Sequence, residues 1–279
     1  MKTTRPKPVR AALAAVSAAA LVALAGCANY AQPSASAPGN GGSAAAPALV
    51  SPGKLTVCTH LAYKPFQFKD SSNKTVGFDV DLMDLVAKKL GVTQEIVDIE
   101  FEQITSGAVF AAKKCDTGAA AITINETRQA AAPFSDPYFD ATQALLVKTG
   151  SGIADLPDLK GKVLAVQTGT TGQDYAKSNA EANGYTIKVF DDMPGGANAV
   201  LSDAADANIN DNGVLYDFAK DNPGVEVVKE FATGEQYGFN VAKDNPALLA
   251  VINETLAAAK SDGSYNEIYK KWFGVDAPK

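Results

Sequence analysis

Histidine and cysteine are scarce in this sequence: one histidine and three cysteines occur among 279 residues. A metal centre built from His and Cys needs several of them at defined spacing, so such a centre is nearly excluded. The chain also lacks the glycine-rich phosphate loop that ends in Lys and Ser or Thr. It shows no Ser/His/Asp set for nucleophilic catalysis. We therefore expect no metal, no cofactor and no enzyme.

Positive charge is scarce as well. The chain has 25 Lys and Arg against 31 Asp and Glu, and four of the basic residues lie within the first ten. Beyond residue 26 the remaining 253 residues include 21 basic and 31 acidic ones, a net charge of −10. Such an acidic chain is a poor candidate for binding nucleic acid or an anionic lipid surface, although a local cationic site for a small anion remains compatible with it.

A hydrophobic run long enough to span a membrane is missing too. Residues 11–25 are almost all Ala, Leu and Val, but this run is shorter than the about 20 apolar residues that a spanning helix needs. Because it follows a basic start without acidic residues, it is typical of a secretory signal segment over residues 1–26.

The sequence Leu24-Ala25-Gly26-Cys27 ends this segment. Small residues before a cysteine resemble the lipobox of bacterial lipoproteins, in which the cysteine receives a diacylglyceryl group and becomes the first mature residue. Two acyl chains, such as palmitate, suffice for stable anchoring. We therefore expect a lipoprotein outside the cytoplasm, anchored to the cell membrane by Cys27. An ordinary signal peptide with an incidental cysteine is the alternative.

Residues 27–52 are expected to form a disordered tether. Of the 25 residues 28–52, 19 are Ala, Ser, Pro or Gly, and none is charged. Such a segment cannot bury enough apolar surface to fold.

From residue 54 onward, strand patterns alternate with helix patterns. This alternation predicts an α/β fold with mostly parallel sheets. The expected strands are 55–59, 96–99, 119–124, 163–167, 186–190, 207–210 and 225–229, and the expected helices include 79–90, 173–183, 246–261 and 265–273. Asp79 can cap the first of these helices and Asn245 the third.

Cys58 and Cys115 remain as a possible disulfide, because two thiols outside the cell usually pair. Cys58 lies late in one predicted strand, and Cys115 lies just before another that begins near Thr117. If the two strands are parallel neighbours, an offset of about three residues separates the cysteines by about 10 Å, which is too far for a bridge. A disulfide and two separately buried thiols both stay open.

Six stretches of the chain, in this order, resemble the family 3 extracellular solute-binding proteins, the amino-acid receptors of ABC importers. The stretches are Tyr63–Phe68, Gly77–Leu82, Ala121–Arg128, Phe134–Tyr138, Val166–Thr171 and Ile268–Gly274. Any one alone is a weak match, but together they span nearly all of residues 53–275.

The resemblance implies a two-lobed α/β fold of the type II periplasmic-binding-protein class. Each lobe would be a mostly parallel sheet flanked by helices, and two hinge strands would join the lobes. Lobe 1 would be 53–143 plus 239–279, lobe 2 would be 149–234, and the hinge strands would be 143–148 and 236–241. The ligand would lie in the cleft at the carboxyl ends of the strands.

The resemblance also assigns ligand-binding roles. Arg128 would hold the carboxylate of a free amino acid, since a guanidinium offers two charge-assisted hydrogen bonds. Thr123 would donate its hydroxyl to the same carboxylate. Thr170 and Thr171 lie where a strand turns into a helix, and the free N–H groups there favour an anion.

The remaining expected contacts concern the ammonium group and the side chain of the ligand. Asp211 would take the ammonium, and Tyr63 and Phe101 would pack against the side chain. His60 faces the cleft in the family, and Ala121 replaces the Ser or Gly common there. Side-chain specificity would depend on His60, Gln67 and Phe101, and on what lobe 2 contributes around residues 192–196.

The resemblance implies a monomeric receptor for a free polar amino acid that delivers it to the permease and ATPase subunits of an ABC importer. Two alternatives stay open: a sensor or scavenger without a transporter, and a dehydratase-like enzyme on the same fold.

Overall fold

A computed structural model describes residues 46–278, which belong to one compact unit of the chain, Ala44–Lys279. The expected signal segment 1–26, Cys27 and most of the expected tether lie outside the described residues. Among the described residues, no helix is both long and apolar enough to cross a membrane.

The described end of the expected tether is held against the folded chain. The backbone N–H of Val50 donates to Asp116 Oδ1 at 2.6 Å, and the carbonyl of Ala48 accepts from Asn245 Nδ2 at 2.7 Å. The part of the chain that is hydrogen-bonded to the folded lobes therefore begins before residue 53.

Lobe 1 is built on a four-stranded sheet in the order β11-β5-β1-β4. Strand β1 pairs in parallel with both neighbours, and β11 is antiparallel to β5. A short hairpin, β2 and β3, lies outside this sheet. The bounds are β1 (Lys54–Thr59), β2 (Phe68–Lys69), β3 (Thr75–Val76), β4 (Thr93–Asp98), β5 (Thr117–Gly118) and β11 (Asn240–Val241).

Lobe 2 is built on a five-stranded sheet in the order β10-β6-β9-β7-β8. Strand β7 pairs in parallel with β8 and β9, whereas β6 is antiparallel to both β9 and β10. The bounds are β6 (Phe139–Lys148), β7 (Val163–Gln167), β8 (Thr186–Phe190), β9 (Ala207–Asp211) and β10 (Val225–Tyr237). The expected parallel sheets are thus mixed sheets, because β11 in lobe 1 and the connecting strand β6 in lobe 2 pair antiparallel with their neighbours.

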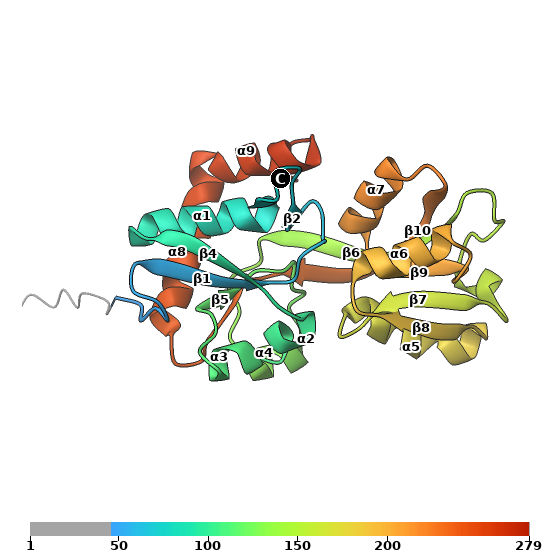
Figure 1. Cartoon of the computed structure of the whole chain (residues 1–279), viewed down its shortest axis with the longest axis horizontal. Coiled ribbons are helices and arrows are strands. Elements are labelled where there is room, and N and C mark those ends of the chain that lie inside the picture. The colour runs from blue at the N-terminus through green and yellow to red at the C-terminus, as the bar shows by residue number, and fades with distance from the viewer. Residues whose placement is uncertain (1–45, 279) are drawn as a thin grey trace, which may run out of the picture. The chain divides into compact units, whose positions relative to one another are not determined.

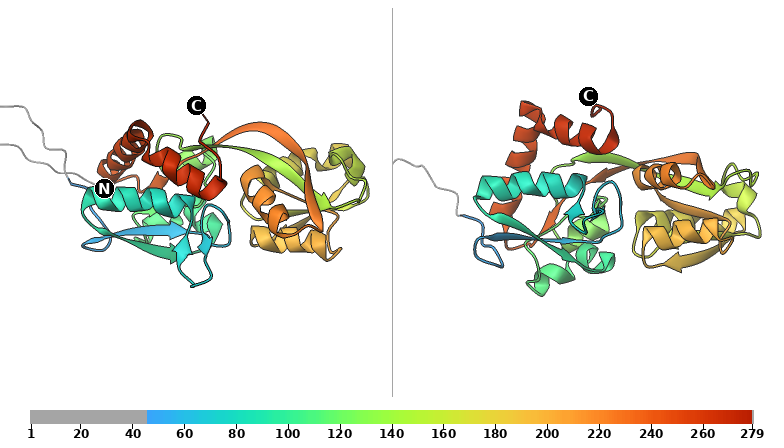
Figure 2. Two further views of the ribbon diagram at one scale, coloured as in Figure 1. Left: turned by 90° about the horizontal axis from the view of Figure 1, so that it is seen from above. Right: turned by 45° about the horizontal axis from the view of Figure 1, so that its top comes forward.

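The two connections between the lobes are β6 and β10, which run side by side (Figure 2). Strand β6 begins at Phe139, before the expected 143–148. Strand β10 is one continuous strand where the sequence indicated separate segments at 225–229 and 236–241.

Helices cover both sides of each sheet. In lobe 1, α1 and α9 lie on one side and α2, α3 and α4 on the other; in lobe 2, α6 and α7 lie opposite α5 (Figure 1). The bounds are α1 (Phe78–Leu90), α2 (Phe101–Thr105), α3 (Ala108–Ala111), α4 (Glu126–Ala131), η1 (Leu156–Leu159), α5 (Thr171–Asn183), α6 (Met193–Leu201), α7 (Asn212–Asp221), α8 (Pro246–Asp262) and α9 (Ser264–Phe273).

Local signals explain where these helices form. Val80, Met83 and Val86 recur at helical spacing and are buried on one face of α1. Helix α1 ends at Gly91, whose φ of 69° is the left-handed conformation that glycine adopts without steric cost. The Asn245 side chain accepts from the backbone N–H of Leu248 and caps α8, as expected.

The expected cap at Asp79 is wrong, and so is most of the strand expected over 119–124. Asp79 is buried in the first turn of α1, where Oδ2 accepts from the backbone N–H of Ala121 at 2.7 Å and Oδ1 accepts from Tyr138 Oη at 2.7 Å. Ala121 has a φ of +49°, which no strand residue adopts. The ladder therefore stops at Gly118, and the chain turns under the carboxylate of Asp79.

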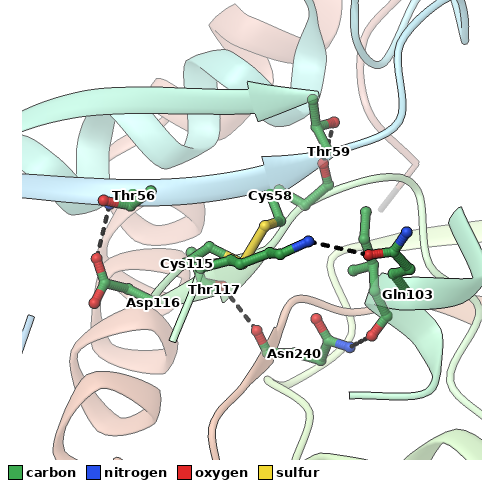
Figure 3. Close-up of a disulfide and its surroundings, with 11 residues drawn as sticks. Thr56, Cys58, Thr59, Gln103, Cys115, Asp116, Thr117 and Asn240 are labelled. Carbon is green, nitrogen blue, oxygen red and sulfur yellow. Dashed lines mark hydrogen bonds between the residues drawn. A yellow bond between two sulfur atoms is a disulfide. The ribbon is translucent and has the colours of Figure 1, made fainter. Parts of the chain in front are cut away.

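Cys58 and Cys115 form a disulfide with a Cα–Cα distance of 5.7 Å (Figure 3). The expected offset of three residues is correct, because Cys58 pairs with Gly118 in the register of β1 and β5. The inferred separation was wrong because it assumed a straight strand. Residue 115 precedes β5, and the chain bends there toward β1.

Candidate ligand-binding site

One cavity between the lobes collects every residue that the sequence assigned to ligand binding. The lining residues are His60, Tyr63, Gln67, Phe101, Ala120, Ala121, Thr123, Arg128, Gln167, Thr170, Thr171 and Asp211.

The strands and helices bring these residues together in a simple way. Most of them follow the carboxyl end of a strand, where open α/β sheets place their ligands. His60 follows β1, Gln167 ends β7, and Asp211 ends β9. Arg128 lies on α4, which is capped by Asn125, whose Oδ1 accepts from the backbone N–H of Arg128 at 2.8 Å.

Arg128 is 6% exposed and contacts both lobes. Nη1 donates to the carbonyl of Thr123 at 2.8 Å in lobe 1, and Nη2 donates to the carbonyl of Gly169 at 3.1 Å in lobe 2. Burial lowers the pKa of the guanidinium, and the charges of Asp211 and Glu235 oppose that shift. A guanidinium has five N–H donors, so donors remain for a ligand.

The turn before α5 presents backbone N–H groups. Thr170 caps the helix: its Oγ1 accepts from the N–H of Gln173 at 3.0 Å and donates to the carbonyl of Gln167 at 2.8 Å. Within residues 46–278, the N–H groups of Thr170 and Thr171 have no hydrogen-bond acceptor. Such free N–H groups at a helix N-terminus favour an anion.

Asp211 is 5% exposed and already accepts several hydrogen bonds. Gln143 Nε2 donates to Oδ1 at 2.5 Å, Tyr63 Oη donates to Oδ2 at 3.0 Å, and Tyr237 Oη also donates to Oδ2. Burial raises the pKa of Asp211 to about 6, and the charge of Glu235 adds to this rise, while the three donors oppose it.

Glu235 is a functional candidate that the sequence did not indicate. Its Oε2 accepts from Thr123 Oγ1 at 2.8 Å and from Thr171 Oγ1 at 2.7 Å, and its Oε1 accepts from Gln143 Nε2 at 3.0 Å. The hydroxyl of Thr123 was expected to donate to a ligand carboxylate, but it donates to Glu235 instead. No local motif marks Glu235, because its partners lie 64 to 112 residues away in the chain.

Gln67, which the sequence linked to specificity, lines the cavity, whereas residues 192–196, named in the same expectation, are not among its lining residues. Gln167 and Ala120, which the sequence analysis missed, line it as well. A signal for Gln167 was present, since this residue ends a predicted strand directly before the Gly169 turn. A signal for Ala120 is its place beside Ala121 in the segment after the strand β5.

The lobes are closed around the cavity. Lys64 Nζ of lobe 1 lies 2.8 Å from Asp221 Oδ2 on α7, and Thr168 Oγ1 of lobe 2 donates to Glu102 Oε1 at 3.2 Å. A Cβ on Gly169, whose φ is +68°, would lie 2.4 Å from Glu102 Cγ. This close approach of the lobes therefore requires glycine at position 169.

Residues 55–275 match the sequence model of the bacterial extracellular solute-binding proteins, family 3. The chain belongs to this family. As a family 3 solute-binding protein it acts outside the cytoplasm, and the two-lobed α/β class expected from the sequence is confirmed. The family match also confirms the resemblance on which those expectations rested.

This solute-binding protein is similar to several characterised proteins. It is 36% identical to the ABC transporter glutamine-binding protein of Bacillus subtilis over 211 residues, 74% of this chain and 76% of that one. An ancestral arginine-binding protein bound to glutamine is similar in structure, with a TM-score of 0.76 and 42% identity over 81% of this chain and 100% of that one. An ancestral amino acid-binding protein described as a precursor of cyclohexadienyl dehydratase has a TM-score of 0.74 and 37% identity, covering 79% and 96% of the two chains.

Proposed function

We propose that the protein captures a free amino acid between its lobes and delivers it to the permease of an ABC importer. This proposal rests on one observation: a buried guanidinium, that of Arg128, and a buried carboxylate, that of Asp211, line the same cavity. A zwitterionic amino acid matches that pair, because each buried charge then gains an opposite partner.

The carboxylate of the ligand lies against Arg128 and the free N–H groups at the start of α5. Two guanidinium donors are engaged by the carbonyls of Thr123 and Gly169, and the others can form a charge-assisted pair with the ligand. The same carbonyl contact to Gly169 ties Arg128 to lobe 2, so binding of the carboxylate and closure support each other.

The ammonium of the ligand lies against Asp211, with the threonine hydroxyls as further acceptors. A hydroxyl has one proton, and those of Thr123 and Thr171 are both donated to Glu235. The oxygen lone pairs of Thr123 and Thr171 therefore remain to accept hydrogen bonds from the ligand. This assigns Thr123 to the ammonium rather than to the carboxylate that the sequence suggested.

Binding without catalysis is the function that the cavity supports. A general acid–base reaction needs placed titratable groups, but Asp211 is surrounded by donors and the His60 ring is held through Nδ1, 3.0 Å from the carbonyl of Ile99. Incubation with the bound amino acid should return it unchanged in mass and configuration. A chemically altered product would favour the dehydratase-like alternative.

Titration calorimetry tests the proposed function. The full-length protein, stripped of ligand by unfolding and refolding, is titrated with each of the twenty amino acids. We expect micromolar or tighter binding of at least one, and Arg128→Ala should weaken it at least 100-fold, because it removes a bidentate charge-assisted contact. Lys177→Ala, which removes an exposed charge on α5, is the matched control. Binding by Arg128→Ala within threefold of the parent protein would contradict the site.

The anchor and the transport partners form a separate part of the proposal. The lipobox-like sequence before Cys27 supports a diacylglyceryl anchor, and family membership supports a permease and an ATPase as partners of a monomeric receptor. A labelled fatty acid should be incorporated into the parent protein and not into Cys27→Ala. Absence of label from the parent protein would contradict the anchor.

A further inference from the structure

Two hydrogen-bond acceptors in the cavity have no partner within the described chain. Gln67 is 1% exposed; its Nε2 donates to the carbonyl of His60 at 3.3 Å, and its Oε1 is buried and unpartnered. His60 Nδ1 lies 3.0 Å from the carbonyl of Ile99, and a carbonyl only accepts, so Nδ1 carries the proton. In the neutral ring, Nε2 is then an acceptor, and it is also buried and unpartnered.

One donor complements these two acceptors. Gln167 is 2% exposed and lines the same cavity from lobe 2. Its Oε1 accepts from Asn210 Nδ2 at 3.3 Å, which fixes the orientation of the amide. Its Nε2 donates to no acceptor in residues 46–278. The three side chains together offer two acceptors and one donor.

The charges lining the cavity are already used by the α-groups of an amino acid. Arg128 and Asp211 are the guanidinium and the carboxylate among the lining residues, and they pair with the ligand's carboxylate and ammonium. No carboxylate, guanidinium or ammonium of the described lining is left for the ligand's side chain. A charged side chain would lose its hydration there without an opposite charge, which is costly.

We propose that the subsite formed by His60, Gln67 and Gln167 recognises a side-chain carboxamide, so that the ligand is glutamine or asparagine. The amide NH₂ donates to Gln67 Oε1 and His60 Nε2, and the amide oxygen accepts from Gln167 Nε2. This assignment rests on the proposed amino-acid binding. The two acceptors and one donor of the subsite complement a carboxamide, which has two N–H donors and a carbonyl acceptor.

Other polar side chains match this count less well. A serine or threonine hydroxyl has one proton and leaves one of the two acceptors unpaired. A glutamate or aspartate carboxylate would face two acceptors, and an arginine or lysine cation would have no counter-charge. An unpaired buried polar group discriminates strongly against such ligands.

Comparative titration of the full-length protein tests the proposal. The ligands are L-glutamine, L-asparagine, L-arginine, L-lysine, L-glutamate and L-serine. We expect glutamine or asparagine to bind at least tenfold more tightly than each of the others. If arginine, lysine, glutamate or serine binds as tightly, the carboxamide assignment is overturned while amino-acid binding stands. If no amino acid binds at all, the proposed function itself fails.

Variants of the subsite provide the second arm. Gln67→Glu supplies a counter-charge, so the affinity ratio of arginine to glutamine should rise at least tenfold. Gln129→Glu, which adds the same charge at an exposed position of α4, should leave the ratio within twofold. If thermal melting shows that Gln67→Glu does not fold, Gln167→Met is used in its place. That variant removes the donor Nε2 together with Oε1, the acceptor of Asn210 Nδ2, and should weaken glutamine binding at least tenfold; unchanged affinity would overturn the assignment.

Discussion

Thr123 of lobe 1 and Thr171 of lobe 2 donate hydrogen bonds to the same atom, Oε2 of Glu235, at 2.8 and 2.7 Å. Glu235 lies on β10, one of the two strands that connect the lobes. Because the donors belong to different lobes, both bonds form together only when the lobes are close. The carboxylate of Glu235 therefore stabilises the closed arrangement.

Glu235→Ala should shift the unliganded protein toward an open form. The variant removes the acceptor shared by Thr123 and Thr171, so closure loses two hydrogen bonds to a charged group. We expect a larger radius of gyration in small-angle scattering and an affinity about 100-fold lower, in line with about 1.5 kcal/mol for each of the two hydrogen bonds to a charge. Glu235→Gln keeps one acceptor oxygen and should change both less. Identical scattering and affinity in Glu235→Ala and the parent protein would contradict this role.

Amino-acid affinity should fall as the pH decreases through about 6. Asp211 has a pKa of about 6 in the unliganded protein, and pairing with an ammonium requires its charged form. Below that pH the protonated fraction grows, so the dissociation constant should rise toward tenfold per pH unit. Calorimetry between pH 5 and pH 8 measures this change.

Two variants test the assignment of that pH dependence to Asp211. Asp211→Asn should bind more weakly and lose the pH dependence in this range. Glu235→Gln should move the midpoint to lower pH, because the charge of Glu235 helps to raise the pKa of Asp211. An affinity that stays constant from pH 5 to pH 8 in the parent protein would refute the prediction.

Asp79→Asn should gain stability relative to the parent protein as the pH rises. Burial raises the pKa of Asp79 to about 7, although Ala121 and Tyr138 donate to it. A raised pKa means that the folded state binds the proton more tightly. The contribution of Asp79 to stability is therefore full below about pH 4 and is lost as the pH rises through about 7.

The size of this effect follows from the rise of the Asp79 pKa from 3.8 to about 7, because each pKa unit is worth about 1.4 kcal/mol. The unfolding free energy of the parent protein should fall relative to that of Asp79→Asn by about 4 kcal/mol between pH 4 and pH 8. Urea unfolding at these pH values measures it, and Asp244→Asn on the surface is the control. If the unfolding free energies of the parent protein and Asp79→Asn change with pH in the same way, burial does not perturb the titration of Asp79 and the prediction is wrong.

Replacing Cys58 and Cys115 together with alanine should destabilise the fold. The disulfide closes a loop of 57 residues, and the loss of that constraint on the unfolded chain corresponds to about 4 kcal/mol. Denaturant unfolding of the double variant, and of the parent protein with and without reductant, should give this difference. More than one free thiol per chain in the denatured, unreduced parent protein would contradict the bridge, because Cys27 can supply one by itself.

Local signals in the sequence determined much of the fold. Apolar residues at helical spacing, caps such as Asn245 and terminal glycines such as Gly91 act within a few residues of each other, so the helices and most strands could be predicted from short windows. The nine expected site residues share one cavity because strands in an α/β sheet end at a common edge. Their meeting was predicted from the family resemblance, with which this rule agrees.

Tertiary structure alone decided which group each side chain contacts. Asp79 and Ala121 are 42 residues apart, and Thr123 and Glu235 are 112 apart. The turn at Ala121 brings its N–H to Asp79, and strand β10 carries Glu235 to Thr123. Neither contact is encoded in a short window of the sequence. The sequence by itself thus determined the family, the elements and the set of cavity residues. Packing decided that the hydroxyl of Thr123 is donated to Glu235 and that Asp79 is buried, because one proton serves one acceptor and a carboxyl loses its water only when the surrounding chain covers it.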